Sequence, residues 1–188
     1  MGLLEDNRFG KVVMTAYTMH TLISADRLAA RVRDLGQKIT ADYQGQKLCV
    51  IGVLKGSFIF MADLIRAIDL PLEVEFIGVS SYEGMHSTGH VRISYDLSVD
   101  IEGKHVLLVE DIIDTGTTID YLLKTLEVRA PASLKVACLL SKPEAHTIPI
   151  SIDYVGFEIG KEFVIGYGLD LDGLYRNLPE LKQMQAKV

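Results

Sequence analysis

Continuously apolar segments that alternate with helical patterns constrain the fold of this chain more than any other feature. Segments 48–54, 106–109 and 134–140 are apolar at nearly every residue, so each is expected to be a strand buried on both faces. Between them, residues 25–39, 57–68 and 117–128 have the apolar spacing of amphipathic helices. This alternation predicts an α/β fold with a mostly parallel sheet and helices on both faces.

Composition limits the remaining classes. The 188 residues suit one well-buried core, so a single domain over 1–188 is expected. The net charge of -6 argues against a nucleic-acid partner, because phosphate backbones usually require a basic face. No apolar stretch approaches the roughly 20 residues of a membrane helix. We therefore expect a cytoplasmic protein, with no membrane association, in which Cys49 and Cys138 are buried, reduced thiols.

The segment 106–118 is the most informative for function. Its apolar strand should deliver Glu110 and Asp111 to the carboxyl end of the sheet, where α/β proteins bind ligands. Two adjacent carboxylates repel each other unless something positive lies beside them. A hard dication such as Mg²⁺, or a ligand with several hydroxyls, meets that need.

The turn after this strand has the composition of an anion site. Asp114 opens it, and Thr115, Gly116, Thr117 and Thr118 lead into the next helix. The backbone N–H groups at a helix start are unpaired, and the helix dipole favours an anion there. Glycine allows close backbone approach, and the threonine hydroxyls add donors. One segment can thus hold a phosphate beside a metal and sugar hydroxyls.

Two alternatives compete with this interpretation. Glu110 and Asp111 could be solvated loop charges and Asp114 an ordinary helix cap, but the whole string at a strand end favours a site. An apolar strand followed by Glu-Asp also resembles the Walker B strand of nucleotide-triphosphate hydrolases. That class requires a G-x-x-x-x-G-K-[ST] loop, which the sequence lacks.

Residues 109–118, VEDIIDTGTT, resemble the phosphoribosyl-pyrophosphate motif of type I phosphoribosyltransferases. Within that family the chain resembles the hypoxanthine(-guanine) phosphoribosyltransferases more closely. The further matching segments are 53–56, 80–82, 140–142, 155–159, 163–164, 166–167, 169–170 and 175–176.

The resemblance implies a fold and an activity. The fold is a Rossmann-like, mostly parallel sheet flanked by helices, with a flexible lid loop and a small hood subdomain formed by N-terminal residues and roughly 142–188. The activity is purine salvage: the 5-phosphoribosyl group of phosphoribosyl pyrophosphate moves to N9 of hypoxanthine, and of guanine, giving IMP or GMP and pyrophosphate. The resemblance also implies Mg²⁺ as cofactor and a homodimer or homotetramer.

Roles at the sugar and phosphate follow from the same resemblance. Asp114 is expected beside N7 of the purine as general base or acid. Glu110 and Asp111 are expected to engage the ribose hydroxyls, directly and through Mg²⁺, and Asp170 to help hold a second Mg²⁺ through water. The residues expected to bind the 5′-phosphate are Thr115, Gly116, Thr117 and Thr118.

The pyrophosphate and the lid are assigned in the same way. Lys55 and Gly56 are expected to hold the pyrophosphate with help from Arg176, and the peptide between residues 54 and 55 is expected to be cis. Ser81 and Tyr82 are expected to close over the reaction.

For the purine, Lys142 is expected to donate to the 6-oxo group, Phe163 to stack on the ring and Val164 to contact it through its backbone. Taken alone, Lys142 could be a solvated loop charge and Phe163 a core residue. Leu171 follows Asp170 where an aromatic residue is common in the family, which leaves the fine purine preference open.

Two other functions remain open at this level. One is a regulator that senses phosphoribosyl pyrophosphate and binds nucleic acid, although such proteins usually add a basic face or a further domain. The other is the same chemistry on xanthine or a pyrimidine.

Overall fold

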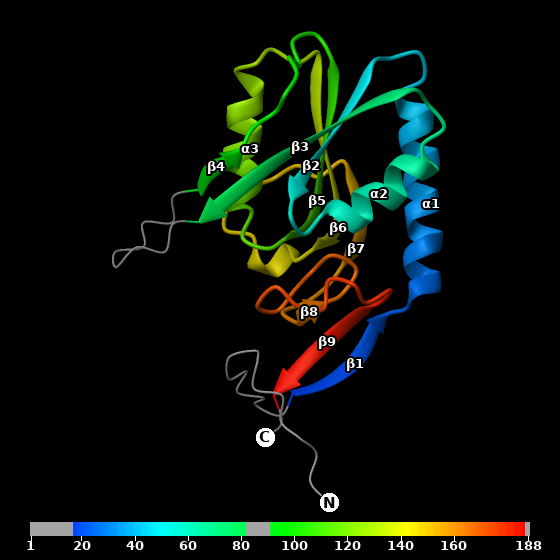
Figure 1. Cartoon of the computed structure of the whole chain (residues 1–188), viewed down its shortest axis with the longest axis vertical. Coiled ribbons are helices and arrows are strands. Elements are labelled where there is room, and N and C mark those ends of the chain that lie inside the picture. The colour runs from blue at the N-terminus through cyan, green and yellow to red at the C-terminus, as the bar shows by residue number, and fades with distance from the viewer. Residues whose placement is uncertain (1–16, 82–90, 187–188) are drawn as a thin grey trace, which may run out of the picture.

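A computed structural model describes residues 17–81 and 91–186, and its centre is a six-stranded sheet. The strands are β2 (Leu48–Leu54), β3 (Leu72–Ser81), β4 (Val91–Tyr95), β5 (His105–Ile113), β6 (Ser133–Ser141) and β7 (Tyr154–Glu158). Their order is β4-β3-β2-β5-β6-β7 (Figure 1). Every neighbouring pair is parallel except β3 and β4, which are antiparallel. The predicted α/β fold class is confirmed.

Three α-helices cover the two faces of this sheet (Figure 1). They are α1 (Ala25–Asp42), α2 (Phe58–Ala67) and α3 (Thr117–Glu127). The Ser24 hydroxyl caps α1 by accepting the Arg27 N–H at 3.5 Å, a typical N-cap contact. None of the helices in residues 17–81 and 91–186 is long and apolar enough to cross a membrane.

Alternate residues of each central strand belong to different halves of the core. Leu48 and Val50 pack with the buried faces of α1 and α2. Cys49 and Ile51 pack with the buried face of α3. Both faces of β2 are therefore buried, which explains its continuously apolar sequence. Cys49 and Cys138 are buried free thiols, as predicted.

A second, three-stranded sheet lies beyond the carboxyl ends of the central strands (Figure 1). It contains β1 (Tyr17–Ile23), β9 (Leu181–Ala186) and β8 (Phe163–Ile165), in the order β1-β9-β8 with antiparallel pairing. It occupies the place of the predicted hood. The sequence did not predict β1 or β9. The exact extents of hood and domain stay predictions.

The structure corrects two boundaries and adds one short helix. Strand β5 does not end at Val109 but continues to Ile113, because Glu110, Ile112 and Ile113 pair with β6. Ser81, which was assigned to the lid, is the last residue of β3, and β4 opens at Val91. A short 3-10 helix, η1 (Pro143–Ala145), follows Lys142 where no helix was predicted.

Candidate active site

A hollow of about 230 Å³ separates the carboxyl ends of β5 and β6 from the hood sheet. Six of the residues predicted to bind substrate or metal meet there, from segments that are far apart in sequence. The residues that line it are Asp111, Ile112, Asp114, Lys142, Phe163, Val164, Leu169 and Asp170.

The two carboxyl groups of β5 lie in a poorly solvated position. Glu110 Oε2 is buried and has no hydrogen-bond partner among the described residues. Burial, with the neighbouring Asp111 charge, raises the pKa of Glu110 well above its usual value. Burial also raises the pKa of Asp111 to about 6, although Asp111 Oδ1 accepts the Ile112 N–H at 2.8 Å. A bound cation, or hydroxyl groups that donate hydrogen bonds, would stabilise the ionised form of both carboxyl groups.

The carboxylates of Glu110 and Asp111 fit an Mg²⁺ ion that a substrate also coordinates. Carboxylate oxygens are the ligands Mg²⁺ prefers, and it usually takes one or two of them together with substrate phosphates and waters. Across residues 17–81 and 91–186, no three His, Cys, Asp or Glu side chains cluster closely enough to form a metal site by themselves. The unpartnered oxygen of Glu110 is therefore a suitable ligand only in combination with others.

Asp170 is engaged on both carboxylate oxygens. Its Oδ1 pairs with Arg176 Nη2 at 2.6 Å, and its Oδ2 accepts the Gly173 N–H at 2.7 Å. These partners leave Asp170 better suited to a water-mediated contact with a metal than to direct ligation, and its metal role stays a prediction.

The predicted phosphate turn forms a second hollow of about 100 Å³ next to Glu110. Gly116 is the N-cap of α3 and has φ +90°, a left-handed conformation that glycine adopts without strain. The hydroxyls of Thr115 and Thr117 lie 3.2 Å apart. The residues that line the turn are Glu110, Ile112, Ile113, Asp114, Thr115, Gly116, Thr118 and Ile119. Its helix start and hydroxyls provide the donors that an anion requires.

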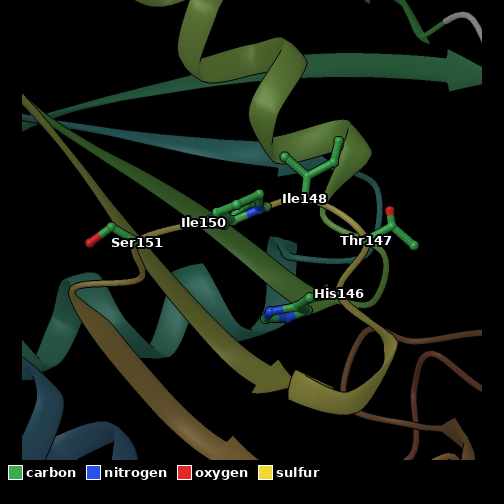
Figure 2. Close-up of a pocket in the computed structure, with 6 residues that line it drawn as sticks. His146, Thr147, Ile148, Ile150 and Ser151 are labelled. Carbon is green, nitrogen blue, oxygen red and sulfur yellow. The ribbon is translucent and has the colours of Figure 1, made fainter.

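Sequence reasoning missed the loop that supports this turn. Thr147 donates to the Thr115 carbonyl oxygen twice, from its backbone N–H at 3.0 Å and from its hydroxyl at 3.2 Å. A Cβ on Gly116 would overlap the side chain of Ile150. Figure 2 shows the loop running past the first turn of α3, with Ile148 close to that turn. No local pattern in the sequence indicates this contact.

The same loop borders a hollow of about 630 Å³, drawn in Figure 2. It is lined by one continuous segment, and the nearest catalytic candidates do not contribute to it. The residues that line it are His146, Thr147, Ile148, Pro149, Ile150 and Ser151. We therefore assign the loop that borders this hollow a structural role, which is to support the phosphate turn.

Lys142 and Asp114 form an ion pair in the lining of the 230 Å³ hollow. Lys142 Nζ lies 3.3 Å from Asp114 Oδ2. The lysine side chain is 12% exposed and the aspartate side chain 54%. The Lys142 backbone N–H also donates to the Ile113 carbonyl at 2.9 Å, which fixes the start of the lysine loop against the end of β5. The simple alternative of a solvated lysine is therefore wrong.

The predicted pyrophosphate residues form a packed corner beside Asp111. The peptide between Leu54 and Lys55 is cis, as the resemblance implied. A Cβ on Gly56 would overlap the Asp111 carboxylate, so the turn lies directly on that group. A Cβ on Gly168 would in turn overlap the Gly56 carbonyl oxygen. Arg176 Nη1 donates to the Gly168 carbonyl at 2.5 Å, which connects the arginine to this corner.

Phe163 begins β8 and is 51% exposed, unusually high for a large aromatic side chain that lines a hollow. A ring in this position offers a free face for stacking, so the interpretation of Phe163 as a core residue is wrong. Ser81 is the last residue of β3, and Tyr82 lies outside the described residues. The closure assigned to Ser81 and Tyr82 stays a prediction.

Comparison with known proteins defines the class. The model of the phosphoribosyl transferase domain matches residues 21–172. That match covers most of the chain, and the carboxylate pair and phosphate turn lie within it. The chain therefore belongs to the phosphoribosyltransferase family.

Individual similar proteins indicate which group within this family the chain resembles. Hypoxanthine phosphoribosyltransferase of Haemophilus influenzae is 48% identical over 169 residues, which cover 88% of this chain and 94% of that protein. A crystal structure of a hypoxanthine phosphoribosyltransferase from Staphylococcus aureus matches with a TM-score of 0.85 and 42% identity, covering 95% of this chain and 97% of that one. The predicted resemblance to hypoxanthine(-guanine) phosphoribosyltransferases is confirmed.

Some relatives are much longer. The bifunctional protein TilS/HprT of Listeria innocua is 46% identical over 168 residues, which cover 89% of this chain. The chain spans about a quarter (26%) of that protein's length.

Proposed function

We propose that this chain transfers the 5-phosphoribosyl group of phosphoribosyl pyrophosphate to N9 of hypoxanthine, and of guanine, in purine salvage. The observation that carries this proposal is the hollow in which Asp111, Asp114, Lys142 and Phe163 meet. This hollow brings together side chains that can bind sugar hydroxyls, accept a proton, donate to an oxo group and stack on an aromatic ring.

The purine lies between the hood and the ends of β5 and β6. Phe163 stacks on the ring, Val164 contacts it through its backbone, and the Lys142 ammonium donates to the 6-oxo oxygen. A purine presents N7 and O6 on the same edge, so Asp114 and Lys142, 3.3 Å apart, match two adjacent ring positions.

The sugar phosphate lies along the end of β5. The backbone and hydroxyls of residues 115–118 bind the 5′-phosphate at the start of α3. Glu110 and Asp111 accept hydrogen bonds from the ribose hydroxyls. Their carboxylates also fit Mg²⁺, which when bound supplies positive charge beside the leaving pyrophosphate.

In the transfer itself, the bond from C1 of the ribose to the pyrophosphate oxygen breaks as the bond from N9 to C1 forms. Asp114 accepts the proton that the purine loses at N7, a step of the kind that general-base catalysis typically accelerates by about 10²–10⁴. Lys55, the Gly56 backbone and Arg176 hold the departing pyrophosphate. The lid that contains Ser81 and Tyr82 excludes water from the sugar.

The test is to incubate the protein with phosphoribosyl pyrophosphate, Mg²⁺ and one purine or pyrimidine at a time, and to measure nucleotide by chromatography. We expect IMP from hypoxanthine and GMP from guanine. Nucleotide from xanthine or a pyrimidine alone would replace the substrate assignment. Binding of phosphoribosyl pyrophosphate without any nucleotide would favour the sensor instead.

Assembly and location complete the proposal. A homodimer or homotetramer is implied by the family resemblance and is checked by analytical ultracentrifugation. A cytoplasmic location is checked by cell fractionation.

A further inference from the structure

We propose that Tyr167 is a positioning residue that holds the segment 166–170 of the hood against the Lys55–Gly56 turn, an inference that rests on the proposed function. The Tyr167 hydroxyl donates to Asp63 Oδ2 at 2.5 Å. Tyr167 follows β8, whereas Asp63 belongs to α2, the helix that begins immediately after the turn. The bond thus joins the hood to the helix that follows the pyrophosphate residues Lys55 and Gly56.

The backbone of this segment has an unusual conformation. Tyr167 has φ +48°, between Gly166 at +98° and Gly168 at +107°. Positive φ is unfavourable for a residue with a Cβ, so surrounding contacts must hold Tyr167 there. Tyr167 is 7% exposed, and its backbone N–H donates to the Leu178 carbonyl at 2.9 Å. Burial and the bond to Asp63 both raise the pKa of the phenol, which therefore remains a donor at neutral pH.

The conformation of Tyr167 determines where the next residues lie. Gly168 sits directly on the Gly56 carbonyl oxygen. Arg176 donates to the Gly168 carbonyl at 2.5 Å and pairs with Asp170 at 2.6 Å. Segment 166–170 therefore sets the distance from Asp170 and Arg176 to Gly56. A shift of this segment would separate the groups assigned to pyrophosphate.

Leu169 and Asp170 of this segment also line the purine hollow, but the residues assigned to the purine ring and the 5′-phosphate are held by other contacts. Phe163 and Val164 are held by the β8–β9 ladder, opposite Met184 and Gln183. The phosphate turn is held by the loop that contains Thr147. Loss of the Tyr167 hydroxyl should therefore weaken the pyrophosphate side and spare the nucleotide side, whereas a purely structural role would weaken both.

The experiment measures two dissociation constants by isothermal titration calorimetry in buffer with Mg²⁺, one for inorganic pyrophosphate and one for IMP. For Tyr167→Phe we expect the Kd for pyrophosphate to rise about tenfold, the scale of one lost hydrogen bond to a charged group. We expect the Kd for IMP to change less than about twofold on the same scale.

Asp63 provides the matched variants. Asp63→Asn keeps a carbonyl oxygen that can accept the hydrogen bond from the phenol, so this variant should bind pyrophosphate nearly as the wild type does. Asp63→Leu removes the acceptor and should reproduce Tyr167→Phe, and it also serves if Tyr167→Phe does not fold. Asp63 is additionally paired with Arg66, so Arg66→Gln tests that contact and should leave both constants unchanged.

Unchanged pyrophosphate binding in Tyr167→Phe and Asp63→Leu would overturn the inference and leave the proposed function intact. Equal weakening of both ligands would also overturn it, by showing a general loss of structure. A wild-type protein that binds no pyrophosphate in the presence of Mg²⁺ would overturn the proposed function, and the inference with it.

Discussion

Lys142 Nζ lies 3.3 Å from Asp114 Oδ2 across the ends of two adjacent parallel strands. The fold thus places the proposed general base next to the cation assigned to the 6-oxo group. In the proposed mode of binding, O6 of the purine takes the ammonium as a partner and N7 faces the carboxylate. Because the strand ends hold both groups in place, the cost of ordering them on purine binding is lowered.

Replacement of Asp114 by asparagine should reduce kcat by about 10²–10⁴, because the amide cannot accept the N7 proton. The side chain is 54% exposed, so the fold should be unaffected. Stopped assays of IMP formation, with circular dichroism of the purified variant, provide the measurement. Wild-type turnover in Asp114→Asn would remove this residue from proton transfer.

Replacement of Lys142 by alanine should raise KM for hypoxanthine by about 10- to 100-fold, since a hydrogen bond to a charged group contributes about 1.5–3 kcal/mol. Discrimination between 6-oxo and 6-amino purines should also weaken, because the donor that rejects the amino group is gone. The measurement is kcat/KM for hypoxanthine and adenine. Lys124→Ala, which removes an exposed lysine of α3, is the control and should change neither value.

Replacement of Gly116 by alanine should raise KM for phosphoribosyl pyrophosphate. The new Cβ would overlap Ile150, and φ +90° is unfavourable for alanine, so the start of α3 must move away from the phosphate. Gly45→Ala is a matched control, because Gly45 has φ +74° but no atom within 4 Å of its Cβ position. That control should lose about 1–2 kcal/mol of stability without a change in KM. Equal KM values in the two variants would contradict this account.

The stability of the ligand-free protein should fall as pH rises through about 6. The pKa of Asp111 is raised by burial from 3.8 to about 6, so the folded state binds the proton more tightly than the unfolded state. Stability from this group is complete below about pH 4 and is lost as the carboxyl ionises. Asp111→Asn should therefore stabilise the protein at pH 8 by up to about 3 kcal/mol, and by roughly half of that at pH 5.

Urea denaturation with a chelator present, at pH 5 and pH 8, measures this difference. Asp26→Asn, on the exposed side of α1, is the control variant. A gain from Asp111→Asn that is the same at both pH values would show that ionisation is not its cause.

The parts of the fold that the sequence predicted are those with a local signal. The apolar run 48–54 and the helical spacing of Leu28, Val32 and Leu35 became β2 and α1 because burial determines both pattern and structure. Strands β1 and β9 were missed because β1 is largely exposed, with Ile23 as its one buried residue. Their pairing joins residues more than 150 positions apart, which no local pattern reveals.

The candidate site also has a part with a local sequence signal and a part without one. The carboxylates and the phosphate turn lie within the single segment 110–118, so their sequence shows them together. The bond between Tyr167 and Asp63 spans 104 positions, and the support of Thr115 by Thr147 spans 32. These contacts depend on how elements pack after folding. Their residues are ordinary in sequence, and the packing alone gives them a role.

The central position of β9 in the hood sheet affects the order in which the chain folds during its synthesis on the ribosome. Strands β1 and β8 both pair with β9, so neither has its sheet partner until β9 emerges. The six-stranded sheet, with the carboxylates and phosphate turn, can fold earlier from residues already translated. A nascent chain would thus form its site for the sugar phosphate before its site for the purine. It could catalyse the transfer only after both sites had formed.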